Sequence, residues 1–90
     1  MSYVIVVKNK LDKTQSLPKE QCILKESLKE AREAFKEKLK EYYTAYYSGD
    51  DFWDAEGLQD LVDSEYEEYI GAGYFACMDD YVITLSKVPV

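Results

Sequence analysis

The chain has 90 residues, of which 47% are hydrophobic and 32% are charged, and its formal net charge is −7. This length suits one domain spanning residues 1–90, and the composition excludes a disordered chain. The purely apolar runs are short, as in Val4–Val7, and residues 1–25 lack the apolar stretch of a secretory signal. We therefore expect a cytoplasmic protein that does not span a membrane.

The first predicted elements are a strand over Tyr3–Lys8, a polar loop or long hairpin connection over residues 9–21, and a short strand over Cys22–Lys25. Tyr3–Lys8 is apolar on both faces, which suits a strand covered on both sides or one whose second face meets a partner. A helix should follow Ser27, because Ser27 and Glu30 have the spacing of a capping box. It runs to about Tyr47, with the apolar stripe Leu28, Ala31, Phe35, Leu39, Tyr42 and Tyr46, and Ser48-Gly49 ends it.

A second helix is predicted from an N-cap at Asp54 to about Ile70, with apolar positions at Leu58, Leu61, Val62, Tyr66 and Tyr69. A further capping box, Ser64-x-x-Glu67, can divide this helix in two, and residues 71–73 end it. The remainder indicates a hairpin of strands Tyr74–Cys77 and Tyr81–Val88 with its turn at Asp79-Asp80. The fold class is therefore α+β, a small antiparallel sheet of three or four strands with two helices packed on one face.

The charge is divided between the two halves of the chain. Residues 1–40 hold ten basic and six acidic residues, whereas residues 41–90 hold twelve acidic residues and one basic residue, Lys87. Such an acidic half repels nucleic acid and anionic membrane, and it attracts basic proteins. We therefore expect no direct binding of nucleic acid or membrane.

Catalysis finds little support in the composition. The sequence contains no histidine, which excludes Ser-His-Asp and Cys-His catalysis and removes the commonest zinc ligand. The acids at 50, 51, 54 and 56 lack the spacing of a calcium-binding loop. We expect no enzymatic activity, no cofactor and no metal. Cys22 and Cys77 are expected to be reduced thiols, although a single bridge between two strands stays open.

The candidate binding site is an acidic stripe on the second helix. Glu56, Asp60, Asp63 and Glu67 are four, three and four residues apart, which places them within a narrow arc opposite the apolar positions. Acidic turns flank the helix, and two large aromatic residues among these acids can stack on arginine. The predicted partner-binding residues are Asp50, Asp51, Phe52, Trp53, Asp54, Glu56, Asp60, Asp63, Glu67, Asp79 and Asp80. The alternative is that the stripe is the solvated outer face of an ordinary amphipathic helix.

The run Tyr42–Tyr47 contains four tyrosines. Core packing is one interpretation of this run, and a contact patch is the other, because tyrosine is enriched at interfaces.

In its size, its single domain, and its acidic helix and turns over Asp50–Glu68 and Asp79-Asp80, the chain resembles the small acidic inhibitors of bacteriophages and mobile elements. These include anti-CRISPR proteins and DNA mimics. The resemblance implies a stoichiometric blocker of a nucleic-acid-binding enzyme, located in the cytoplasm of the host. Because residues 1–40 carry a net positive charge, a single acidic face is expected rather than mimicry over the whole surface.

Three functional hypotheses follow, of which the last is a small enzyme, which would need a pocket with convergent carboxylates or tyrosines. The first is a binding protein that inhibits a basic, nucleic-acid-binding protein by occupying its groove. The second is a module that self-associates through its sheet, as a homodimer, because Tyr3–Val7 is apolar on both faces.

Overall fold

The computed structural model describes residues 2–10, 17–47, 54–77 and 81–88. Its elements are β1 (Ser2–Asn9), β2 (Glu20–Lys25), α1 (Leu28–Tyr46), α2 (Ala55–Tyr69), β3 (Tyr74–Cys77) and β4 (Tyr81–Val88). This order confirms the predicted α+β class. β2 begins two residues earlier than predicted, and α2 is continuous through Ser64, so the second capping box does not divide it. The predicted features at Ser48-Gly49 and Asp79-Asp80 lie outside the described residues.

The four strands form one antiparallel sheet in the order β2-β1-β4-β3. The central pair consists of β1 and β4, which come from opposite ends of the sequence and are aligned from Ser2 opposite Val88 to Asn9 opposite Tyr81. β2 and β3 are the two edge strands. Cys22 lies in β2 and Cys77 in β3, and these edge strands are three strand spacings, about 14 Å, apart. This backbone separation exceeds the Cα distance that a disulfide can span.

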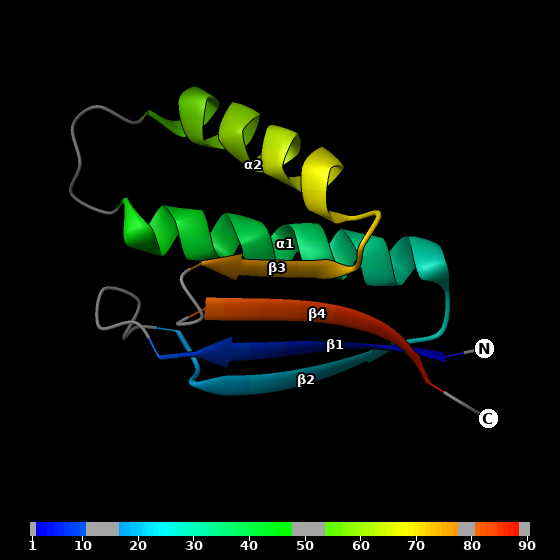
Figure 1. Ribbon diagram of the computed structural model, residues 1–90. Coiled ribbons are helices and arrows are strands. Elements are labelled where there is room, and N and C mark those ends of the chain that lie inside the picture. Colours follow the sequence, from blue (N-terminus) through cyan, green and yellow to red (C-terminus); the bar gives the residue numbers. More distant parts are fainter. Residues whose placement is uncertain (1, 11–16, 48–53, 78–80, 89–90) are drawn as a thin grey trace.

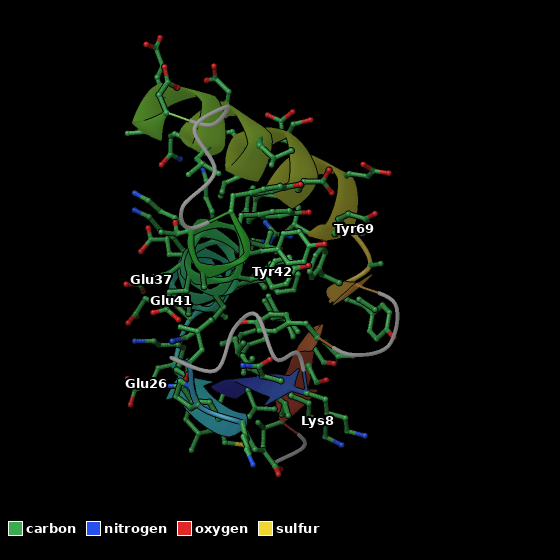
Figure 2. All side chains as sticks on the ribbon, turned by 90° about the vertical axis from the view of Figure 1, so that its left-hand side faces the viewer. Lys8, Glu26, Glu37, Glu41, Tyr42 and Tyr69 are labelled. Carbon is green, nitrogen blue, oxygen red and sulfur yellow. The ribbon has the colours of Figure 1, made fainter. Side chains whose placement is uncertain are left out.

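Both helices lie on the same side of the sheet, at different distances from it. α1 packs directly on β1, β4 and β2, and α2 packs on the outer side of α1 (Figure 1). Figure 2 shows α1 end-on between the sheet and α2. The opposite face of the sheet is covered by no other element of the described chain.

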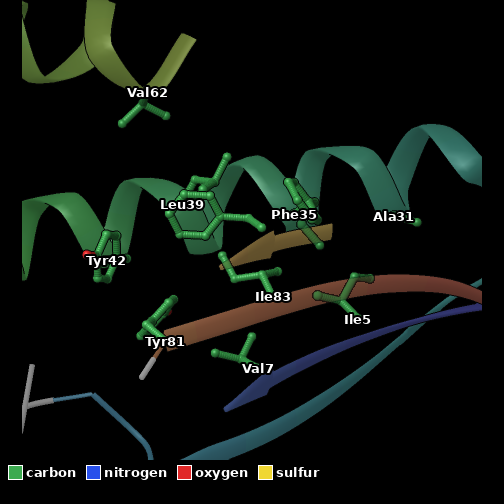
Figure 3. Packing of buried hydrophobic residues seen from close by; sticks show 11 residues of the cluster. Ile5, Val7, Ala31, Phe35, Leu39, Tyr42, Val62, Tyr81 and Ile83 are labelled. Atoms are coloured by element: carbon green, nitrogen blue, oxygen red, sulfur yellow. The ribbon is translucent and has the colours of Figure 1, made fainter. Parts of the chain in front are cut away.

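Most of the core lies between α1 and the sheet, and Val62 of α2 lies on the other side of α1 (Figure 3). Strand alternation sends every second residue of β1 and β4 toward α1, and the predicted helical stripe meets them. The buried apolar residues are Ile5, Val7, Ala31, Ala34, Phe35, Leu39, Tyr42, Val62, Phe75, Tyr81 and Ile83. The predicted apolar stripe of α1 does not extend into the core at Leu28, whose side chain is 37% exposed. Side chains at the start of a helix point back beyond its first turn, where the core does not reach.

The helix ends follow from the capping residues. At the start of α1 the Glu30 backbone N–H donates to Ser27 Oγ, and the Ser27 hydroxyl donates to the Glu30 carboxylate, each over 3.1 Å, which confirms the capping box. After α2 the chain turns at Gly73, whose φ of 64° is the left-handed region that favours glycine. None of the helices in the described ranges is long and apolar enough to cross a membrane.

Candidate functional site

The candidate site is the outer side of α2, and its position follows from the cap that starts the helix. Asp54 Oδ1 accepts a hydrogen bond of 2.7 Å from the Gly57 backbone N–H, which confirms Asp54 as the N-cap. Its negative charge also suits the positive end of the helix dipole. Asp54 is exposed, but its carboxylate already accepts a hydrogen bond from the helix backbone. Its main role is therefore to cap α2.

Three of the four stripe residues face solvent. Glu56, Asp60 and Glu67 are exposed, and Val62, on the other side of the helix, is the residue of α2 that is buried. Figure 2 shows carboxylate oxygens projecting from the outer side of α2, away from α1 and the sheet. The sequence places no lysine or arginine anywhere between Lys40 and Lys87, so α2 offers no internal counter-charge to these acids.

Asp63 is the member of the stripe that the structure places differently. Its carboxylate accepts from Lys36 Nζ of α1 at 2.6 Å and from the Gln59 side-chain amide at 3.0 Å, and its side chain is half-buried. Lys36 also lies 5.2 Å from the centre of the Tyr66 ring, a cation–π distance. Asp63 therefore joins α2 to α1 instead of pointing to a partner. Sequence spacing missed this because the counter-charge comes from another helix.

The environment of Asp63 makes a prediction about pH. The hydrogen bonds from Lys36 and Gln59, followed by the charges of Lys36 and Lys40, hold the pKa of the Asp63 carboxyl below its ordinary value of 3.8. A lowered folded-state pKa contributes stability that is present above about pH 4 and is lost as the pH falls through the lowered value. Asp63→Asn should therefore lower the urea midpoint modestly at about pH 7.

The difference between Asp63→Asn and the native chain should close as the pH falls from the ordinary aspartate pKa through the lowered pKa of Asp63 in the folded protein, where the native carboxylate becomes protonated. Urea unfolding followed by circular dichroism at a series of pH values measures this. Asp60→Asn is the matched control, since Asp60 is an exposed aspartate on the same helix and its replacement removes the same charge. Equal pH profiles for the two variants would contradict the role assigned to the Lys36 pair.

Further acids near the end of α2 add to the negative field, and the spacing rule missed them. Burial and the charge of Glu68 raise the pKa of the Glu65 carboxyl, against a hydrogen bond from the Tyr43 hydroxyl. The charges of Glu68 and Glu65 raise the pKa of the Tyr69 hydroxyl. Glu68 is exposed and lies one position after Glu67, about 100° round the helix. The acidic face, defined here as Glu56, Asp60, Glu67 and Glu68, is therefore wider than the predicted arc.

Six predicted partner-binding residues fall outside the described residues: Asp50, Asp51, Phe52, Trp53, Asp79 and Asp80. Whether they extend the acidic face stays a prediction. What the structure brings together on α2 is Glu56, Asp60 and Glu67, with Asp54 at its start and Asp63 at the α1 contact.

The tyrosine run is a packing feature to a large extent. Tyr42 is 2% exposed, and its ring lies 4.4 Å from that of Tyr81 and 5.6 Å from that of Phe75, centre to centre. The rings of Tyr43 and Tyr47 stack at 6.2 Å, and Tyr43 packs against the core. These contacts favour the core interpretation for Tyr42 and leave Tyr47 and Tyr46 half-buried at the margin.

An open groove runs between the two helices, lined by Glu33, Lys36, Glu37, Lys40, Gln59 and Val62. Its α1 side alternates acids and lysines, so Glu33 and Lys36, like Glu37 and Lys40, form pairs of opposite charge three residues apart. Within the described ranges, no group of three Asp, Glu or Cys side chains is placed to hold a metal ion. The chemical feature that stands out on the helix-covered side of the molecule is therefore the unpaired negative charge of the exposed acids of α2.

Comparison of the chain with protein-family models, curated proteins and solved structures found no match.

Proposed function

We propose that this chain is a non-enzymatic binding protein whose acidic face docks on the basic groove of a nucleic-acid-binding protein and thereby inhibits it, as anti-CRISPR proteins and DNA mimics do. The observation that carries the proposal is a helix whose exposed acids, Glu56, Asp60, Glu67 and Glu68, have no basic neighbour on the same helix. Uncompensated charge of one sign steers a partner of the other sign and accelerates encounter.

The spacing of these acids suits a groove that binds a phosphate backbone. Glu56 and Asp60 are about 6 Å apart along the helix axis, and Asp60 and Glu67 about 10 Å. Phosphates of one DNA strand advance about 3.4 Å per nucleotide, so basic side chains that bind alternate phosphates meet carboxylates at a comparable interval. A rigid helix fixes these intervals better than a loop does.

The rest of the molecule supports one acidic face rather than an acidic surface all round. The exposed basic residues of the described ranges belong to α1, the sheet and its loops: Lys8, Lys10, Lys19, Lys29, Arg32, Lys40 and Lys87. α2 is the element farthest from the sheet, with α1 between them (Figure 2). A basic partner is therefore drawn to the α2 side.

The test is a charge reversal of the exposed acids that leaves the helix contact intact. Glu56→Lys, Asp60→Lys and Glu67→Lys together should weaken partner binding at least about tenfold, because attraction becomes repulsion. Asp63 is left unchanged, since its carboxylate holds Lys36. The matched control reverses Glu26, Glu33 and Glu37, which are also exposed. Each triple variant changes the formal net charge from −7 to −1, so the two variants differ in the position of the reversed charges and not in their number.

The native chain and both triple variants are immobilised, exposed to lysate, and washed at rising salt, and the retained proteins are identified by mass spectrometry. The expected result is retention of nucleic-acid-binding proteins by the native chain and the control, release at high salt, and displacement by duplex DNA. Equal retention by both triple variants would show that the stripe is only a solvated face.

A further inference from the structure

The open face of the sheet, the one turned away from α1, is apolar. Its residues follow from the register, since Ile5, Val7, Ile83 and Tyr81 point into the core (Figure 3). The open face comprises Ser2, Val4, Val6, Lys8, Glu20, Cys22, Leu24, Tyr74, Ala76, Val82, Thr84, Ser86 and Val88. An antiparallel sheet with one solvated face normally alternates apolar residues inward with polar residues outward. Here most of the outward positions are apolar as well.

The two most exposed large apolar side chains of the described residues lie on this face. Leu24 is 70% exposed and Tyr74 is 46% exposed, and they belong to the two opposite edge strands, β2 and β3. One row of neighbouring residues crosses the whole sheet between these edges, from Cys22 through Val6 and Thr84 to Tyr74. A largely apolar patch that is at least partly exposed across a whole sheet face is typical of an interaction surface.

The open face has no net charge. Its charged residues, Lys8 and Glu20, have opposite signs and are register partners at one end of the face. Figure 2 shows Lys8 on the side away from the helices. The acidic face of α2 is on the far side of the molecule, beyond α1. A partner that fits the open face must therefore itself be apolar and neutral, which excludes the basic groove proposed for α2.

We propose that the occupant of the open face is a second copy of this chain, in a two-fold dimer whose sheets stack face to face. A second copy offers the same neutral, apolar surface, and an isologous interface requires such self-complementarity. Stacked sheets pack about 10 Å apart with their strands roughly aligned. This arrangement turns both α2 helices outward, so both sheets and both α1 helices separate the acids of the two copies.

The area is sufficient for a specific but moderate dimer. Three strands of 6 to 8 residues and one of 4 residues, about 4.8 Å apart and rising about 3.3 Å per residue, make a face of roughly 20 by 20 Å. Stacking two such faces removes on the order of 1,000 Å² of accessible surface, which is at the lower end of specific interfaces. We expect dissociation at micromolar concentrations.

The test is the oligomeric state of the native chain and of three lysine variants, by sedimentation equilibrium from about 1 to 200 µM. Leu24→Lys and Tyr74→Lys should each weaken dimerisation at least about tenfold, because each places a charge in the interface. Leu28→Lys is the matched control, since Leu28 is an exposed leucine on α1 and should leave the dimer unchanged. Lysine reduces the net negative charge, so weaker association of a variant cannot come from greater repulsion.

The two variants lie on opposite edge strands, so together they distinguish stacking of the sheet faces from pairing of two sheet edges. A dimer joined through the β2 edge alone would be sensitive to Leu24→Lys and not to Tyr74→Lys. The dependence on salt concentration distinguishes stacking of the apolar faces from association through opposite charges. Dimerisation of two copies of charge −7 should strengthen between about 0.1 and 0.5 M NaCl, as screening reduces their repulsion. Binding of the acidic face to a basic partner should weaken over the same range, so the two proposals fail independently.

The thiol of Cys22 gives a second readout, because Cys22 is exposed and free on this face. Its alkylation rate, followed by peptide mass spectrometry to separate it from Cys77, should fall as the concentration of the native chain rises. The rate should not change with concentration in Leu24→Lys. A native chain that stays monomeric throughout, or a dimer that persists in both face variants, would overturn the proposal.

Discussion

Replacing Tyr42 by alanine should lower the free energy of unfolding by about 3–5 kcal/mol, the range for removal of a large aromatic side chain from a core. Tyr42 is 2% exposed and lies where α1 meets the sheet. Its ring centre is 4.4 Å from that of Tyr81, 4.9 Å from that of Tyr43 and 5.6 Å from that of Phe75. Since small domains are stable by only about 5–15 kcal/mol, this loss is a large share of the total.

Urea unfolding followed by circular dichroism measures the effect, with Tyr74→Ala as the control. Tyr74 is the same residue type, but it is 46% exposed, so its truncation should cost about 1 kcal/mol or less in dilute protein. If Tyr42→Ala does not fold, Tyr42→Leu keeps the test usable, because leucine fills part of the space and should cost about 1–3 kcal/mol. Equal losses for the alanine variants of Tyr42 and Tyr74 would contradict the core assignment.

Gly73→Ala should lower the free energy of unfolding by about 2 kcal/mol or more. Gly73 has φ of 64°, which costs a residue with a Cβ about 1–2 kcal/mol. A Cβ at Gly73 would also lie 2.8 Å from the Leu85 carbonyl oxygen, which belongs to the backbone of β4 and cannot rotate away. The Leu85 backbone N–H donates to the Gly73 carbonyl over 2.7 Å, so a shift of this turn disturbs its attachment to the sheet.

Gly71 is the matched control, two residues earlier in the same turn. A Cβ there meets no atom within 4 Å. Gly71→Ala should therefore change stability by less than about 1 kcal/mol, in either direction, because a glycine replaced without strain loses entropy mainly in the unfolded chain. Thermal and urea unfolding of the two variants side by side measure the difference. Similar stabilities would show that the turn adapts more readily than its geometry implies.

The sequence predicted the elements well because their signals are local. The Ser27 and Glu30 box, the Asp54 cap and the alternation in Tyr81–Val88 each depend on residues a few positions apart. The contact of α2 with α1 was not predictable in this way, because periodicity says which face of a helix is buried and not what covers it. Asp63 shows the consequence, since Lys36 lies on another helix and 27 positions away in the sequence.

The apolar character of β1 on both faces was visible in the sequence, but its meaning was not. Residues Val4 and Val6 fit a strand covered on both sides as well as a strand whose second face meets a partner. The structure separates these alternatives for the described chain, because both helices lie on one side of the sheet. The position of Leu24 and Tyr74 on the same open face needed the strand order and register, which connect residues about fifty positions apart.

The pairing of β1 with β4 has a consequence for how the chain reaches this structure during synthesis. Val7 lies opposite Ile83, so β1 has no partner on that edge until residues 81–88 have been made and have left the ribosome. Until then β1 can form only its hairpin with β2, and two strands alone are marginally stable in water. The apolar residues of β1 therefore lack one of their two neighbouring strands until residues 81–88 have emerged. We expect the nascent chain to need protection from aggregation, and the sheet to form late and cooperatively.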